Sequence, residues 1–95
     1  MSAFVIFEVD VKDPERYEQY RAAAPATLSG FGGRYIARGG RTECLEGEWE
    51  PKRVVLLEFP SYEQARAWFD SSEYAAAREI RSGAAEATIV VVDGV

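Results

Sequence analysis

Apolar residues recur at the spacing of β-strands in four parts of the chain. From Ala3 to Val11 the odd positions are apolar, and the even positions begin apolar before they turn acidic. The run Val54–Leu57 leaves neither side polar, so we expect that strand to lie in the middle of a sheet. The predicted strands are Ala3–Val11, Arg34–Arg38, Arg53–Phe59 and Ala87–Val92.

The first helix is predicted from its start signal. Asp13 suits the N-cap, and Pro14 suits the first helical position, where its missing N–H costs nothing. Pro25 cannot donate a backbone hydrogen bond and clashes with the preceding turn. We therefore expect this helix to end at about Ala24, followed by a short turn from Pro25 towards Ser29.

A second helical segment follows the third strand. Ser61 and Gln64 form a capping-box pattern that starts it. Asp70 and Glu73 repeat the pattern, which predicts that the helix breaks there and resumes. Gly83 ends the segment, because glycine readily adopts the left-handed conformation that follows many helices.

The segment between the second and third strands is less regular. We expect residues 41–47 to continue as a weaker extended piece, after a break or bulge at Gly39 and Gly40. Trp49 lies among glutamates, which predicts a solvated loop with one anchoring aromatic residue.

The resulting order, β-α-β-β-α-β, is that of the ferredoxin-like motif, an α+β sandwich with an antiparallel sheet. Right-handed crossovers place the strand at 3–11 beside the strand at 53–59 in the middle, with both helices on one face. No repeat or linker divides the chain, so we expect residues 1–95 to form one domain. The other face would expose an apolar surface too large for a stable monomer, and a symmetric homodimer that joins two sheets would cover it.

Charge and composition argue against several functions. The chain has a formal net charge of -5, whereas a nucleic-acid-binding protein needs clustered Lys and Arg. It has no His, which removes Ser-His triads and the usual ligands of zinc and haem iron. The carboxylates are scattered rather than spaced as in a calcium or magnesium loop, so we expect no metal site and no cofactor.

Cys44 is the single cysteine, so no intramolecular disulfide can form, as is typical of a cytoplasmic protein. Without a His to activate it, Cys44 is expected to be a half-buried structural residue rather than a nucleophile. No stretch approaches the roughly 20 apolar residues that cross a bilayer. We therefore expect neither nucleic acid nor a membrane as a partner.

Polar side chains from several elements are candidates for one pocket between sheet and helices. Arginine suits bidentate recognition of a carboxylate, and aromatic walls suit a small organic acid or a planar aromatic ligand. In the structural alternative, Arg38 or Arg53 forms a salt bridge with Glu58 or Glu46. Arg81 would then cap the end of the second helix. The candidate ligand-binding residues are Tyr20, Arg38, Arg53, Glu58, Trp68, Tyr74 and Arg81.

Three stretches and a later arginine carry a resemblance to a known family. The stretches are YEQYRAAAPATLSGFGGRYIARGG, EGEW and VLLEFPSYEQARAWFDSSEY. Together they resemble the DUF1330 proteins, a bacterial family of unknown function in the dimeric α/β-barrel superfamily. The resemblance implies a ferredoxin-like protomer, a dimer whose two sheets form a barrel, and a ligand site between the sheet and the helices of each protomer. It implies no established reaction.

Two functions are consistent with these features. The first is a homodimer that binds a small acidic or aromatic metabolite without catalysis. The second is a cofactor-free enzyme, monooxygenase-like or isomerase-like, in which Glu58 or a tyrosine transfers the proton because His is absent. A desolvated Glu58 within reach of an arginine would favour the enzyme, and a solvated Glu58 would favour binding or a structural role.

Overall fold

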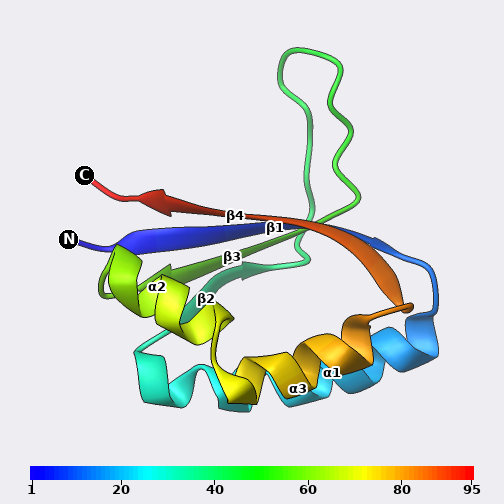
Figure 1. Cartoon of the computed structure of the whole chain (residues 1–95). Helices are drawn as coiled ribbons and strands as arrows, with labels where there is room; N and C mark the ends of the chain where they lie inside the picture. Colours follow the sequence, from blue (N-terminus) through cyan, green and yellow to red (C-terminus); the bar gives the residue numbers. More distant parts are fainter.

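The apolar stretches form one antiparallel sheet, seen in a computed structural model that describes all residues 1–95 (Figure 1). The strands are β1 (Ala3–Val11), β2 (Arg34–Arg38), β3 (Arg53–Phe59) and β4 (Ala85–Asp93). Their order across the sheet is β2-β3-β1-β4, so the two strands that are apolar on both sides lie in the middle. The ferredoxin-like α+β fold is thereby confirmed.

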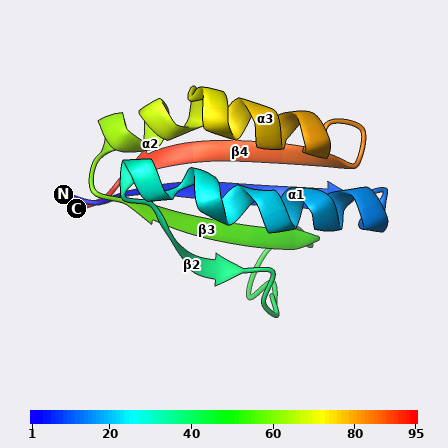
Figure 2. The same cartoon turned by 90° about the horizontal axis from the view of Figure 1, so that it is seen from below.

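Three helices cover one face of this sheet: α1 (Pro14–Thr27), α2 (Tyr62–Phe69) and α3 (Ser72–Arg81). Figure 2 shows α1 beside α3, with β2 beyond α1 at the edge of the sheet. A 3-10 turn, η1 (Ser29–Phe31), follows α1. The break predicted at Asp70 is confirmed, although the side chain that caps α3 is that of Ser71. No helix is long and apolar enough to cross a bilayer.

The end predicted for the first helix is wrong. α1 continues through Pro25 to Thr27 instead of stopping at Ala24. Proline at this position removes one hydrogen bond, the one that would be donated to the carbonyl of Arg21. The final turn of a helix tolerates that loss when the free carbonyl finds another donor.

The extended piece predicted at residues 41–47 is also absent. The 14 residues between β2 and β3, 39–52, form no strand and project from the sheet face opposite the helices (Figure 1). We call this segment the arm. Cys44 lies on it and is exposed rather than half-buried.

The core between sheet and helices is centred on Trp68. Its ring centroid lies 4.1 Å from that of Tyr74 and 5.3 Å from that of Phe59. Its Nε1 donates a hydrogen bond to Thr27 Oγ1 at 2.9 Å. The indole therefore joins α2 to α3, to β3 and to the last turn of α1.

The sheet is apolar on its other face too, which we call the open face. Odd-numbered residues of β1 and β3 are buried against the helices, so the even-numbered ones point away from them. Ile6 lies between Leu56 and Val90 in the register of the three strands. The apolar residues of the open face are Phe4, Ile6, Val54, Leu56, Val90 and Val92.

One hydroxyl pair is buried within the core. The hydroxyl oxygens of Tyr20 and Tyr74 lie 2.8 Å apart, and each residue is at most 6% exposed. Burial is the main cause that raises the pKa of both phenols. Both phenols therefore remain protonated at neutral pH, and each hydroxyl has the other as its hydrogen-bond partner.

Tyr20→Phe and Tyr74→Phe should each lower the free energy of unfolding by about 1–3 kcal/mol, because each leaves the other buried hydroxyl without its partner. The double substitution should cost less than the sum of the two. Urea unfolding monitored by circular dichroism measures this, with the exposed Tyr62→Phe as the control. Strictly additive losses would contradict the pairing.

The stability of the protein should fall as the pH rises above about 10, the pKa of a tyrosine in an unfolded chain. The pKa of Tyr20 and Tyr74 is raised by folding, so the unfolded chain loses these protons first. The contribution of the two phenols is complete below pH 10 and decreases above it. Urea titrations between pH 8 and 11 should show a shallower decrease for the Tyr20→Phe, Tyr74→Phe double variant, and equal slopes would contradict this origin.

Candidate functional site

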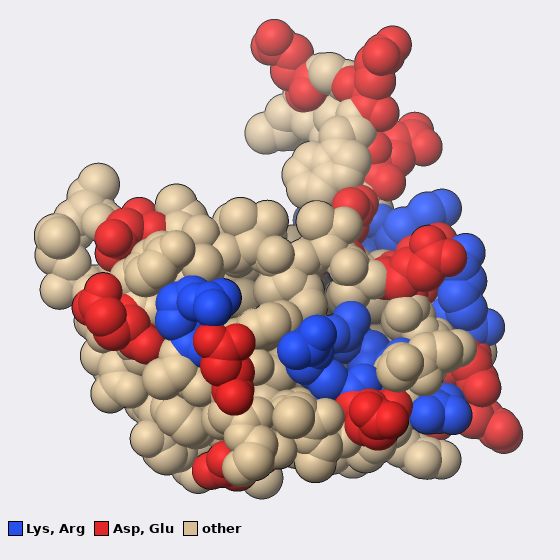
Figure 3. All heavy atoms as spheres, in the orientation of Figure 1, with Lys and Arg blue, Asp and Glu red and all other residues tan.

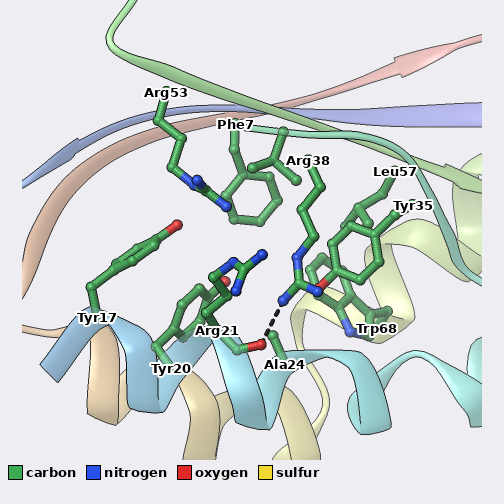
Figure 4. Close-up of a pocket in the computed structure, with 11 residues that line it drawn as sticks. Phe7, Tyr17, Tyr20, Arg21, Ala24, Tyr35, Arg38, Arg53, Leu57 and Trp68 are labelled. Atoms are coloured by element: carbon green, nitrogen blue, oxygen red, sulfur yellow. Dashed lines mark hydrogen bonds between the residues drawn. The ribbon is translucent and has the colours of Figure 1, made fainter. Parts of the chain in front are cut away.

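A cleft lies between α1 and the strands β2 and β3 (Figure 4). The volume open to the centre of a water molecule is about 20 Å³, which is room for about one water. Aromatic side chains form most of its walls. The residues that line it are Phe7, Tyr17, Tyr20, Arg21, Ala24, Tyr35, Arg38, Arg53, Val55, Leu57 and Trp68.

The cleft concentrates positive charge in a chain whose net charge is -5. Arg21, Arg38 and Arg53 line it, and no Asp or Glu does. Of the three, only Arg21 forms a salt bridge, with Glu18 on the same helix. The structural alternative of an ion pair for Arg38 or Arg53 is therefore wrong, and both cations remain without a carboxylate partner.

Arg53 reaches into the cleft beside Tyr17 and Gly39. Its guanidinium carbon lies 5.5 Å from the centroid of the Tyr17 ring, and its Nε is buried without a hydrogen-bond partner. A buried donor left without a partner costs roughly 1–3 kcal/mol. Gly39 has a φ of 73°, and a side chain there would overlap the guanidinium of Arg53. Glycine at this position therefore provides both the turn and the space for the cation.

A bulge in β2 turns Arg38 towards the helices. Tyr35 pairs with Leu57 and Arg38 pairs with Val55, with the register shift between Tyr35 and Ala37. Both pairing partners on β3 face the helices, so both β2 side chains do as well. In a regular strand, residues three apart would point to opposite faces. The extra residue of the bulge is what brings Arg38 to the same side as Tyr35.

The carbonyl that holds Arg38 is the one that Pro25 leaves free. Arg38 Nη2 donates to the Arg21 carbonyl oxygen at 2.5 Å (Figure 4), and the residue four positions after Arg21 is Pro25. The Arg38 guanidinium also lies over the ring of Tyr35, 4.3 Å from its centroid. Burial raises the pKa of the Tyr35 phenol, and Arg38 partly opposes that rise. Arg38 thus connects β2 to α1 across the cleft.

Four of the seven residues expected to form the site line the cleft: Tyr20, Arg38, Arg53 and Trp68. Tyr74 does not line the cleft, but its hydroxyl is hydrogen-bonded to that of Tyr20, which does. Arg81 lies with its guanidinium carbon 5.7 Å from the Tyr20 ring centroid, outside the lining. Its Nε is also buried without a partner.

Arg81 does not cap the end of its helix as the structural alternative expected. The carbonyl oxygens of Ile80 and Glu79 accept hydrogen bonds from Arg16 of α1, at 2.7 and 3.2 Å. An arginine 64 positions earlier in the chain therefore supplies the donors for the end of α3. The local sequence around Arg81 does not indicate that Arg16 would bind these carbonyl oxygens.

Glu58 does not share the cleft with Arg53. It follows the even-numbered positions of β3 and so points to the open face, where it accepts a hydrogen bond from Arg34 Nε at 2.8 Å. A hydrogen bond from Ser2, and next one from Arg34, hold the pKa of the Glu58 carboxyl below its usual range. Glu58 is therefore ionised and paired with Arg34, on the opposite side of the sheet from Arg38 and Arg53 of the cleft.

Several residues of the cleft were not among the expected site residues. Tyr17, Arg21 and Ala24 share a helical face with Tyr20, at spacings of three and four, and this periodicity is a signal that points to them. Tyr35 becomes a neighbour of Arg38 only through the bulge. No pattern in the sequence reveals that bulge, because it depends on pairing with β3.

Several solved structures share this fold at low sequence identity. The protein RPA0582 from Rhodopseudomonas palustris, of unknown function, has a TM-score of 0.77 and 17% identity, covering 99% of this chain and 82% of that one. SnoaB, a cofactor-independent oxygenase from Streptomyces nogalater, has a TM-score of 0.70 and 10% identity, covering 99% and 93%. A dimeric ferredoxin-like protein of unknown function from Thermobifida fusca has a TM-score of 0.59 and 16% identity, covering 99% and 92%.

At these identities the likeness establishes the fold alone. No curated protein matches the chain. The model of a family described as a domain of unknown function, DUF1330, matches residues 2–95. That match spans nearly the whole sequence, so this chain belongs to the DUF1330 family.

Proposed function

We propose that the protein is a homodimer that binds a small organic acid through its carboxylate, in the cleft of each protomer. The observation that carries the proposal is the buried Nε of Arg53, which has no hydrogen-bond partner. It belongs to a cleft with three arginines and no carboxylate among its lining residues. An anion would supply the missing acceptor and the missing charge.

The shape of the donor group favours a carboxylate. The Nε and one Nη of a guanidinium form a planar edge that matches the two oxygens of a carboxylate. The ring of Tyr17 restrains the orientation of the Arg53 guanidinium. Such a preorganised donor loses little conformational entropy when an anion binds.

Binding of a ligand in the cleft requires the Arg38 side chain to move. The cleft holds about one water molecule while Arg38 is bonded to the Arg21 carbonyl. Breaking this bond frees the guanidinium, which can then donate to the same anion as Arg53. The aromatic walls formed by Tyr17, Tyr35 and Trp68 favour a ligand whose remaining body is planar or apolar.

The enzymatic alternative requires a group that transfers a proton near neutral pH. Glu58, its main candidate, lies on the other face of the sheet and is paired with Arg34. Tyr20 and Tyr35 line the cleft with their pKa raised, so they act as hydrogen-bond donors rather than bases at neutral pH. These observations favour binding over catalysis by those residues.

The homodimer is supported by the open face. Val90 and Val92 are 50% and 44% exposed there, beside Phe4 and Ile6 of the neighbouring strand. The Thermobifida fusca protein with this fold is described as dimeric. A second copy placed face to face would remove these apolar side chains from water, which stabilises by roughly 25 cal/mol per Å² of apolar area.

Benzoate should raise the melting temperature of the protein, and benzamide should not, because only the first is an anion. At about 100 times its Kd, a bound ligand adds roughly 2.7 kcal/mol to the free energy of unfolding. Arg53→Met should abolish the shift, while Arg66→Met, the same change at an exposed arginine of α2, should preserve it. Acetate, phthalate and phenylacetate extend the series in a thermal-shift assay. Equal shifts in Arg53→Met and the parent would rule out this role for Arg53.

Val90→Lys should weaken the dimer by at least tenfold in Kd, because it places a charge on the apolar face, next to Ile6 of the central strand β1. Gln19→Lys makes the same charge change on the exposed surface of α1 and should leave the dimer unchanged. Sedimentation velocity between 1 and 100 μM measures both. A parent protein that stays monomeric throughout this range would overturn the homodimer.

A further inference from the structure

The arm is long for the connection that it makes. Hairpin connections usually take two to five residues, and this one takes 14. All residues 39–50 are exposed, so the arm has no core of its own. Long connections without secondary structure are uncommon in a compact domain, and binding residues are disproportionately found on loops.

One hydrogen bond orients the base of the arm. Trp49 Nε1 donates to Glu8 Oε2 at 2.8 Å, and Glu8 is an open-face residue of β1. The arm therefore rises on the same side of the sheet as the apolar residues of the open face (Figure 1). Any molecule that covers the open face lies next to the arm.

The arm exposes apolar surface that its own chain does not cover. Leu45 is 90% exposed and Trp49 is 58% exposed. Between and around them lie four glutamates, and acidic side chains gather on the arm in Figure 3. None of these carboxylates forms a salt bridge within the chain. They are Glu43, Glu46, Glu48 and Glu50.

We propose that the arm packs against a second copy of this chain and buries Leu45 and Trp49 against the body of that copy. In a symmetric face-to-face dimer, each protomer presents one arm and receives the other. Each arm stands beside the open face of its own protomer, so a second copy that covers this face places its body against the arm. The proposal rests on the homodimer of the proposed function but not on ligand binding.

The single cysteine provides a direct test, because Cys44 is exposed on the arm next to Leu45. The parent protein is labelled at Cys44 with benzophenone-maleimide and irradiated at a concentration where sedimentation shows a dimer. We expect covalent dimers on a denaturing gel. Mass spectrometry of a mixture of 14N and 15N protein should show crosslinks from the arm to the body of the other copy.

The matched control moves the label to the helical face. Cys44→Ser combined with Gln19→Cys, labelled in the same way, should give no covalent dimer, because Gln19 lies on the side of the sheet opposite the arm. A dimer that gives only crosslinks within one chain from Cys44 would overturn the arm contact and leave the homodimer standing. A monomer at every concentration would overturn both.

An affinity measurement tests the same contact without a label. Leu45→Ser with Trp49→Ser should raise the dimer Kd at least tenfold, and Trp49→Phe, which keeps an apolar ring, should raise it less. Glu46→Gln is the control, because it alters an arm residue without removing an apolar side chain. These residues are exposed, so circular dichroism should show an unchanged fold. A Kd that the double variant leaves unchanged would contradict the proposal.

Discussion

The constraint on which the rest of this structure depends is a sheet that is apolar on both faces and covered by helices on one. β1 and β3 carry apolar side chains in both directions, and α1, α2 and α3 bury only the odd-numbered ones. One side of the sheet consequently becomes the hydrophobic core of the chain, with a cleft. The other side remains an apolar surface with an arm standing beside it, and the two sides offer different kinds of contact.

The cleft is built where regular structure is interrupted. Pro25 removes one hydrogen bond from α1, and the bulge in β2 turns Arg38 towards the carbonyl that this leaves free. Gly39 then allows the backbone to pass close to the guanidinium of Arg53. Each interruption costs stability by itself, and together they produce two cations without anionic partners. Such an arrangement is typical of a binding site rather than of a core optimised for stability.

Local patterns in the sequence were sufficient for most of the architecture. The caps at Asp13 and Ser61 and the alternation in β1 predicted where the elements begin and which strands are central. Tyr20 and Trp68 were expected in the site because they lie on apolar helical faces that must meet the sheet. These features depend on residues within one or two turns of each other, so they can be read without knowing the fold.

The tertiary structure alone decided which polar groups meet. Arg53 and Glu58 belong to one strand but point to opposite faces, and a bulge of a single residue moved Arg38 from one face to the other. Arg16 rather than Arg81 completes the end of α3 because α1 packs beside it. The sequence by itself determined the fold, the excess of arginine over lysine and the absence of His. The position of each arginine depended on pairing between distant segments, which no local pattern encodes.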